Sequence, residues 1–273
     1  MQIMRIPGVT WAWKLIRSGQ TGFLLAEIWT RLYKHVWEWF FALKYRLPGR
    51  LPGSRDFQIA VQTKFPIAYE SPDHIVPFGT TRDNSTNKKF VDYMASKLKS
   101  EMPEAQLGVL DLGCSGGQLV RDFLDLGWMA VGLEGSDFSL KHRRANWPAL
   151  AGKSLFTCDI TKPFTVMAGH KPARFHLLTM WEVLEHIHPK DLPQLFTNIL
   201  AHLEPGGYFV ASTTSTPDIH DGVDLHQTKW TNAEWHQWLA EHHPGLEPVD
   251  LRLKFYQFVR HNAERSFLSL RRK

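Results

Sequence analysis

The chain has 273 residues, 32 Lys and Arg against 27 Asp and Glu, a formal net charge of +5 and a pI near 9.2. This length accommodates one domain with a substantial core and leaves an extension to explain. The basic residues fall in short runs at 141–144 and 271–273, which we interpret as solvated faces. No zinc-finger, basic-zipper or RNA-binding signature accompanies them, so nucleic acid is not an expected partner. Cys114 and Cys158 form no obvious disulfide framework, which indicates a reducing, intracellular compartment.

The first 70 residues are rich in tryptophan and basic residues. Between 22 and 46 an apolar stripe recurs at near-helical spacing, at Leu25, Trp29, Leu32, Val36, Phe40 and Leu43. Charged residues interrupt it, so no span is long enough to cross a bilayer, and no cleavable signal is evident. We predict an amphipathic helical extension over residues 1–70. It packs on the catalytic domain or in a homodimer, or it lies on a membrane surface. The expected location is cytoplasmic, with peripheral membrane contact as the alternative.

The rest of the chain carries apolar runs separated by helical or turn segments. Five runs read as buried strands, namely 109–112, 129–134, 154–160, 175–181 and 208–213. A helix is expected to begin near Asn87 and to bury Phe90, Met94 and Leu98. Such an alternation predicts an α/β fold with a doubly wound parallel sheet, whose ligand groups lie at the carboxyl ends of the strands.

The first run enters a glycine-rich turn that contains Gly113, Gly116 and Gly117. Glycines let the backbone approach a ligand closely and adopt positive φ. The next run ends at Glu134, about 20 residues downstream, where such folds place an acceptor for ribose hydroxyls. The glycine spacing does not fit the Gly-x-Gly-x-x-Gly pattern of dinucleotide-binding dehydrogenases.

Five motifs occur in one order: Asp-Leu-Gly-Cys-Ser-Gly at 111–116, Glu134, Cys-Asp-Ile at 158–160, Glu-Val-Leu-Glu-His at 182–186 and Glu-Pro-Gly-Gly at 204–207. Over residues 80–260 this order resembles the class I S-adenosylmethionine-dependent methyltransferases. The resemblance implies a methyltransferase domain over 71–273, with a Rossmann-like, seven-stranded, mostly parallel sheet and helices on both faces. It implies S-adenosylmethionine as cofactor, bound by Asp111, Gly113, Cys114, Ser115, Gly116, Glu134, Asp159, Ile160 and Trp181.

Glu182, Glu185 and His186 stand at i, i+3 and i+4, which predicts one chelating helical face. The motif resembles the metal site of ubiquinone-pathway and small-RNA O-methyltransferases, where a divalent ion coordinates the substrate oxygens. His226, in the loop after the fifth run, is the expected further ligand. Carboxylate and imidazole groups suit magnesium, manganese or zinc. The alternatives are catalysis by Glu185 or His186 as base or hydrogen-bonding group without a metal, and a packing role.

The polar loop 213–226 suggests how an acceptor is bound. Its Asp218, Asp221, Asp224 and His226 offer hydrogen bonds to a polyhydroxyl substrate, and Trp230 offers a flat face to a sugar ring. We therefore expect O-methylation of a sugar hydroxyl in a glycan or glycosylated metabolite. The alternatives are a quinone or phenol acceptor, or a non-catalytic S-adenosylmethionine-binding interaction protein.

Two local features complete the sequence-based predictions. Thr231 and Glu234 match a capping box that would start a helix after the loop. Before the first run, residues 83–86 are expected to cap the helix near Asn87, and contact of Arg82 or Asp83 with the carboxylate or amine of the cofactor is the alternative. The non-catalytic alternative is disfavoured because Asp111, Glu134 and Asp159 are all present.

Overall fold

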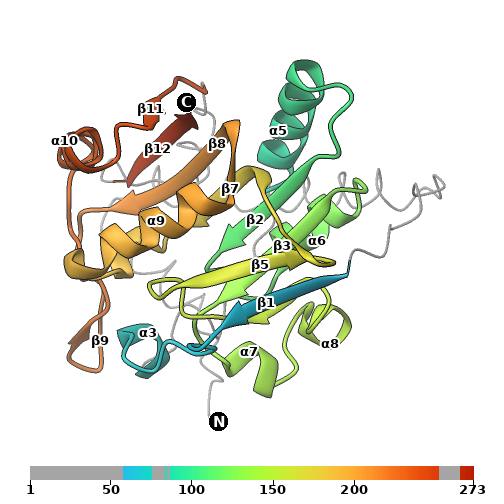
Figure 1. Cartoon of the computed structure of the whole chain (residues 1–273). Helices are drawn as coiled ribbons and strands as arrows, with labels where there is room; N and C mark the ends of the chain where they lie inside the picture. The colour runs from blue at the N-terminus through green and yellow to red at the C-terminus, as the bar shows by residue number, and fades with distance from the viewer. Residues whose placement is uncertain (1–57, 76–83, 85–86, 252–264) are drawn as a thin grey trace, which may run out of the picture. The chain divides into compact units, whose positions relative to one another are not determined.

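The structure is a computed structural model, and it describes residues 58–75, 84, 87–251 and 265–273. Its centre is a seven-stranded sheet in the order β11-β12-β8-β7-β2-β3-β4 (Figure 1). The strands are β2 (Gly108–Leu112), β3 (Met129–Glu134), β4 (Leu155–Thr157), β7 (Phe175–Trp181), β8 (Leu203–Thr214), β11 (Leu246–Pro248) and β12 (Arg265–Arg272).

The strand order places the ligand-binding edge. Strands β4, β3, β2, β7 and β8 are parallel neighbours, whereas β12 is antiparallel to both β8 and β11. From β2 the chain first builds outward through β3 and β4 and later returns to β2 through β7. The crevice between β2 and β7 is therefore the topological switch point, where α/β sheets bind ligands. The expected seven-stranded, mostly parallel sheet is confirmed.

Helices cover both faces of the sheet because alternate strand residues point to opposite sides. Leu110 and Leu178 join one buried cluster with α9, while Val109 and Leu177 join another with α5 and α6. The helices are α3 (Pro72–Ile75), α5 (Lys88–Glu101), α6 (Gln118–Leu124), α7 (Phe138–Lys141), α8 (Trp147–Leu150), α9 (Leu192–His202) and α10 (Asn232–His242). Short 3₁₀ turns lie at Leu184–His186 and Pro189–Asp191.

The helix predicted near Asn87 is α5, which has Asn87 as its N-cap and buries Phe90, Met94 and Leu98 completely. Each such side chain contributes roughly 1.5–3 kcal/mol by leaving water. The predicted capping box is also present, since Thr231 Oγ1 accepts from the Glu234 amide and a Glu234 carboxylate oxygen accepts from the Thr231 amide. The sequence was sufficient to predict where these helices begin, because the signals for each start lie in the helix itself or in the residue just before it.

The carboxyl-terminal residues differ from the sequence-based interpretation. We read the basic run 271–273 as a solvated face, which fits the exposed Lys273, but Arg271 and Arg272 belong to β12. Arg272 donates to Leu200 O at 2.8 Å and also contacts Leu203 O, and the Arg271 guanidinium lies over the Tyr208 ring. These arginines satisfy main-chain carbonyls near the end of α9 and the start of β8.

The last part of the predicted N-terminal extension contains a strand. Residues 1–57 of the predicted 1–70 helical extension lie outside the described residues. Within the remainder, β1 (Ile59–Thr63) pairs antiparallel with β5 (Phe164–Ala168), and β5 pairs with β6 (Lys171–Pro172) in a separate sheet (Figure 1). A further two-stranded sheet joins β9 (Ile219–His220) to β10 (Val223–Asp224). Among the described helices, none combines the length and apolar character required to span a membrane.

Candidate active site

The turn after β2 is tight against its neighbours. Gly113 has a φ of +80° and Ser115 a φ of +45°, both in the left-handed region. The amides of Gly113 and Cys114 donate to Leu133 O at 2.8 and 3.1 Å, which ties the turn to β3. A Cβ added at Gly113 would lie 2.4 Å from Val183 Cγ2. Glycine is therefore required here both by the backbone conformation and by the contact with the chain that follows β7.

Side chains from the α7–α8 region hold Ser115 in this conformation. The indole nitrogen of buried Trp147 donates to Ser115 O at 2.7 Å, and Arg144 Nη2 donates to Ser115 Oγ at 3.1 Å. Arg144 belongs to the basic run that we interpreted as a solvated face, and for this residue the interpretation is wrong. Its guanidinium supports the glycine-rich turn.

Glu134 ends β3 beside that turn and is buried. Its Oε2 accepts from the Ser115 amide at 2.7 Å, and its Oε1 accepts from the Ser136 amide at 3.1 Å. Burial raises the pKa of Glu134 and Asp73 adds to this, whereas the two amides and Arg144 oppose it. The carboxylate is thus fixed by main-chain donors. Each oxygen retains a second lone pair for a ligand.

Asp159 occupies the equivalent position after β4. Its Oδ1 accepts from the Thr161 amide at 2.9 Å and from Thr161 Oγ1 at 2.6 Å, while its own amide donates to Phe65 O. The adjacent Cys158 is a free, buried thiol whose pKa burial raises to about 12. Cys158 therefore stays protonated, and the polar group available at this strand end is Asp159.

Three residues expected to bind the cofactor support the scaffold instead of lining the pocket described below. Asp111 Oδ1 accepts from Thr179 Oγ1 at 2.7 Å, a buried bond between β2 and β7. Cys114 is buried, and burial together with nearby carboxylates raises its pKa well above the usual value. A Cβ at Gly116 would lie 2.3 Å from Asn84 Oδ1. These residues hold together the end of β2, the turn after it and their neighbours.

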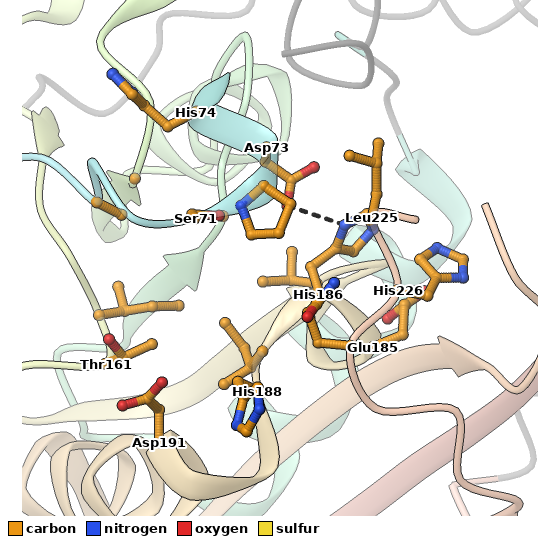
Figure 2. A pocket seen from close by; sticks show the side chains of 18 of the residues that line it. Ser71, Asp73, His74, Thr161, Glu185, His186, His188, Asp191, Leu225 and His226 are labelled. Carbon is orange, nitrogen blue, oxygen red and sulfur yellow. Dashed lines mark ion pairs between the residues drawn. The ribbon is translucent and has the colours of Figure 1, made fainter. Parts of the chain in front are cut away.

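A pocket of about 690 Å³ opens at the carboxyl ends of the parallel strands (Figure 2). Its size is that of a small-molecule or cofactor site. The predicted residues that line it are Gly113, Ser115, Glu134, Asp159, Ile160, Trp181, Glu182, Glu185, His186, Asp218 and His226. The pocket therefore brings most of the expected cofactor residues and all four expected metal ligands to one cavity.

The predicted chelating helix is not present. Glu182 has a φ of +56°, and only the short 3₁₀ turn Leu184–His186 follows it. The Glu182 amide donates to Ser212 Oγ at 3.0 Å, and Ser212 Oγ in turn donates to Glu182 Oε1 at 2.6 Å. Glu182 is thereby turned toward β8, and it does not share a face with Glu185 and His186.

Three of the four predicted ligands do come together. Glu185, His186 and His226 each offer one atom, and these atoms lie within 4.8 Å of one another. The two imidazole rings meet edge to face at 4.7 Å between centroids. Glu185 is completely buried, and its main-chain carbonyl accepts from the amides of Gln227 and Thr228, which fixes the His226 loop against the 3₁₀ turn.

The two histidines differ in charge state. Burial acts to lower the pKa of His186, but the Asp73 carboxylate, whose Oδ2 lies 2.9 Å from His186 Nδ1, outweighs it, with smaller contributions from Glu185 and Asp218. The pKa of His186 is raised to about 9 (Figure 2 shows the ion pair). Burial lowers the pKa of His226, whose Nδ1 contacts Thr216 O.

The acceptor loop is arranged differently from the sugar-binding prediction. Trp230 packs on the hydrophobic core beside α10, with ring centroids 4.8 Å from Trp235, and does not line the pocket. Asp224 pairs with Lys229 at 2.7 Å, and Asp218 Oδ1 lies 2.8 Å from His220 Nε2. Exposed Asp221 is at the turn between β9 and β10. Asp224 thus organises the loop and Asp221 lies outside the pocket, whereas Asp218 lines the pocket.

The sequence analysis assigned no role to Asp73, which precedes the first predicted run together with Arg82 and Asp83. Its partner His186 is distant in the sequence, and no local spacing indicates that the two meet. An acid after a proline at the start of a short helix was the only available signal. Arg82 and Asp83, which we singled out in the same segment, lie outside the described residues.

The fold, the glycine-rich turn and the acidic strand ends define a class I S-adenosylmethionine-dependent methyltransferase. The chain belongs to a family described as a methyltransferase domain, whose model matches residues 81–256. A solved S-adenosylmethionine-dependent methyltransferase from Clostridium acetobutylicum is similar to this chain, with a TM-score of 0.50 and 16% identity over 72% of this chain and 96% of the other. At that identity the likeness shows the fold alone.

Curated relatives are also similar to the chain. A protein named ubiquinone biosynthesis O-methyltransferase from Methylobacterium nodulans is 31% identical over 112 residues, which is 41% of this chain and 43% of the relative. One of the same name from Dinoroseobacter shibae is 29% identical over 170 residues, 56% of this chain and 65% of the relative. The similarity thus spans less than two thirds of these relatives.

Proposed function

We propose that the protein transfers the methyl group of S-adenosylmethionine to a ring hydroxyl of a phenol, catechol or hydroquinone. The observation that carries this proposal is the group Glu185, His186 and His226 in the same pocket as Glu134 and Asp159. The names of the curated relatives support a quinone-pathway type of acceptor. A sugar acceptor has less support, because Trp230 packs on the core and Asp224 pairs with Lys229.

The cofactor would occupy the part of the pocket formed by β2, β3 and β4. In this placement the methionine moiety lies over the turn at Gly113 and Ser115. Glu134 accepts the ribose hydroxyls, and Asp159 accepts the adenine amino group with Ile160 beside the ring. The fixed orientations of both carboxylates support this arrangement, since main-chain donors already hold them. A preorganised acceptor loses little entropy when the ligand binds.

Methyl transfer to a ring hydroxyl requires that the oxygen lose its proton and lie in line behind the sulfonium methyl. His226 suits the role of base. Because Nδ1 contacts the Thr216 carbonyl, which only accepts hydrogen bonds, Nδ1 carries the hydrogen and Nε2 keeps its lone pair. Burial lowers the pKa of His226, which favours this neutral form.

The same residues fit a divalent cation. Both histidines place Nδ1 against an oxygen acceptor, Asp73 for His186 and Thr216 O for His226. That is the usual support of a metal-binding imidazole, which then ligates through Nε2. Glu185, His186 and His226 would hold the ion, and Glu182, bonded to Ser212, would not. Because the pKa of His186 is raised to about 9, binding of the cation would have to release the proton on its Nε2. A bound ion supplies a positive charge that lowers the pKa of a coordinated hydroxyl.

The test is an acceptor screen with radiolabelled S-adenosylmethionine on chelator-treated protein, with and without added Mg²⁺, Mn²⁺ or Zn²⁺. We expect product with catechols and hydroquinones, no product with free sugars, and loss of turnover by more than about 100-fold in Glu185→Gln. Glu182→Gln is the matched control, with a smaller loss. If the chelator does not change turnover, the metal hypothesis is wrong and His226 remains the proposed base. Methylation of sugars but not of phenols would overturn the acceptor class.

A further inference from the structure

The segment 65–74 links the cofactor part of the pocket to the acceptor part. At its start Phe65 O accepts from the Asp159 amide at 2.9 Å, and three residues later the Ala68 amide donates to Gly135 O at 2.9 Å. The chain is therefore pinned to the ends of β4 and β3, next to Asp159 and Glu134. From there it turns into α3, which brings Asp73 to the other side of the pocket.

Asp73 meets His186 at the end of this segment. Its Oδ2 lies 2.9 Å from His186 Nδ1, with the Asp73 side chain 28% exposed and the His186 side chain 15% exposed (Figure 2). Because a carboxylate accepts and does not donate, an ion pair at this distance favours a hydrogen on His186 Nδ1. His186 also contributes one atom to the group with Glu185 and His226, whose atoms lie within 4.8 Å of one another. With Nδ1 beside Asp73, Nε2 is the nitrogen left for a ligand.

We propose that Asp73 is a positioning residue for the acceptor site, because its carboxylate orients the His186 imidazole toward the group formed with Glu185 and His226. This proposal rests on the proposed function. It follows that the site contains an essential part supplied by the segment 65–74, outside the residues matched by the family model. Because this segment is pinned beside Glu134 and Asp159, the cofactor and acceptor parts share one structural support.

The matching arrangement of His226 strengthens the inference. Its Nδ1 contacts a main-chain carbonyl, so both imidazoles of the group are anchored through Nδ1 by an oxygen acceptor. Loss of such an anchor typically weakens metal binding or activity by about 10- to 100-fold. A purely structural role for Asp73 predicts instead a change in stability with no selective effect on metal binding.

The experiment uses the full chain and measures ligand binding, so its result does not depend on methyl-transfer activity. Calorimetry measures the affinity for Mn²⁺ and, separately, for S-adenosylhomocysteine in wild type and Asp73→Asn, with Asp125→Asn on the exposed end of α6 as the control substitution. We expect Asp73→Asn to weaken Mn²⁺ binding by about 10- to 100-fold. Affinity for S-adenosylhomocysteine should stay within about twofold, and Asp125→Asn should match wild type.

A second readout separates this proposal from the metal hypothesis. In ¹⁵N-histidine-labelled protein, the His186 Nδ1–H proton bonded to a carboxylate should give a downfield resonance, assigned by its absence in His186→Gln. Asp73→Asn should remove it. If wild type binds Mn²⁺ and Asp73→Asn binds it equally well, the positioning role is overturned and the metal stands. If wild type binds no Mn²⁺, the metal hypothesis is wrong. In that case, loss of the resonance in Asp73→Asn supports the positioning role of Asp73, and persistence of the resonance overturns it.

Discussion

Substitution of Gly113 by alanine tests whether the turn after β2 is shaped by its contact with Val183. At φ +80° an alanine costs about 1–3 kcal/mol of backbone strain. Its Cβ would also lie 2.4 Å from Val183 Cγ2, an overlap that costs about 1–3 kcal/mol to relieve. We therefore expect Gly113→Ala to lose about 2–6 kcal/mol of unfolding free energy, and S-adenosylhomocysteine affinity to fall with the displaced turn.

The double variant separates these two costs. Val183→Ala removes both methyl groups that meet the new Cβ and by itself costs about 1 kcal/mol for a partly buried valine. Combined with Gly113→Ala, it should cancel the overlap but not the strain, so the two losses should fall short of additivity by about 1–3 kcal/mol. Urea denaturation of the four proteins gives the coupling, and calorimetry gives cofactor affinity. Strict additivity would refute the steric argument.

Two further predictions concern buried titratable groups. Glu134→Gln should weaken S-adenosylhomocysteine binding by about 10- to 100-fold, since a charged acceptor is lost, and calorimetric affinity equal to wild type would exclude Glu134 from the ribose site. His202 is buried, its Nε2 accepts from the Val166 amide at 3.0 Å, and its Nδ1 donates to Asn198 O at 2.7 Å, so burial lowers the pKa of a ring held neutral. As pH falls, the unfolded chain protonates His202 before the folded protein does. The stabilisation that neutral His202 provides is therefore present above about pH 6.5 and is lost as pH falls toward the pKa of the folded state. We expect His202→Gln to reduce the change in denaturation midpoint between about pH 7 and 5.

The sequence predicted the parts of the fold that depend on local pattern. The limits of β3 and β7 coincide with the predicted runs 129–134 and 175–181, because both strands are apolar and bounded by clear changes in composition. By contrast, β1, β11 and β12 were not identified from their residues. β1 is short, and only every second residue of it is partly buried. β12 ends in arginines, which in the sequence resemble a solvated tail because their carbonyl partners near the end of α9 are distant along the chain.

The candidate site was predicted as a set of residues but not as a set of bonds. The order of the strands brings Glu134, Asp159 and Glu185 to one edge, and that order follows from chain connectivity alone. Which donor meets each carboxylate depends on segments that approach from elsewhere. Asp73 and Arg144 reach the site through such segments, so neither was assigned its role by spacing or composition.

The Glu-x-x-Glu-His motif illustrates where spacing stops being informative. In an α-helix, and also in a 3₁₀ turn, residues at i and i+3 lie near one another, so either structure predicts that Glu182 and Glu185 share a face. In this protein the positive φ of Glu182 ends the strand before the 3₁₀ turn begins, and Ser212 of the next strand captures its carboxylate. All three polar residues of the motif line the pocket, but the Glu182 carboxylate bonds to β8, whereas Glu185 and His186 form a group with His226. The backbone conformation of Glu182 alone separates its carboxylate from the other two residues. A variant with helical geometry at residue 182 should therefore move Glu182 away from Ser212. The sequence of the motif by itself does not define which of its residues act as ligands.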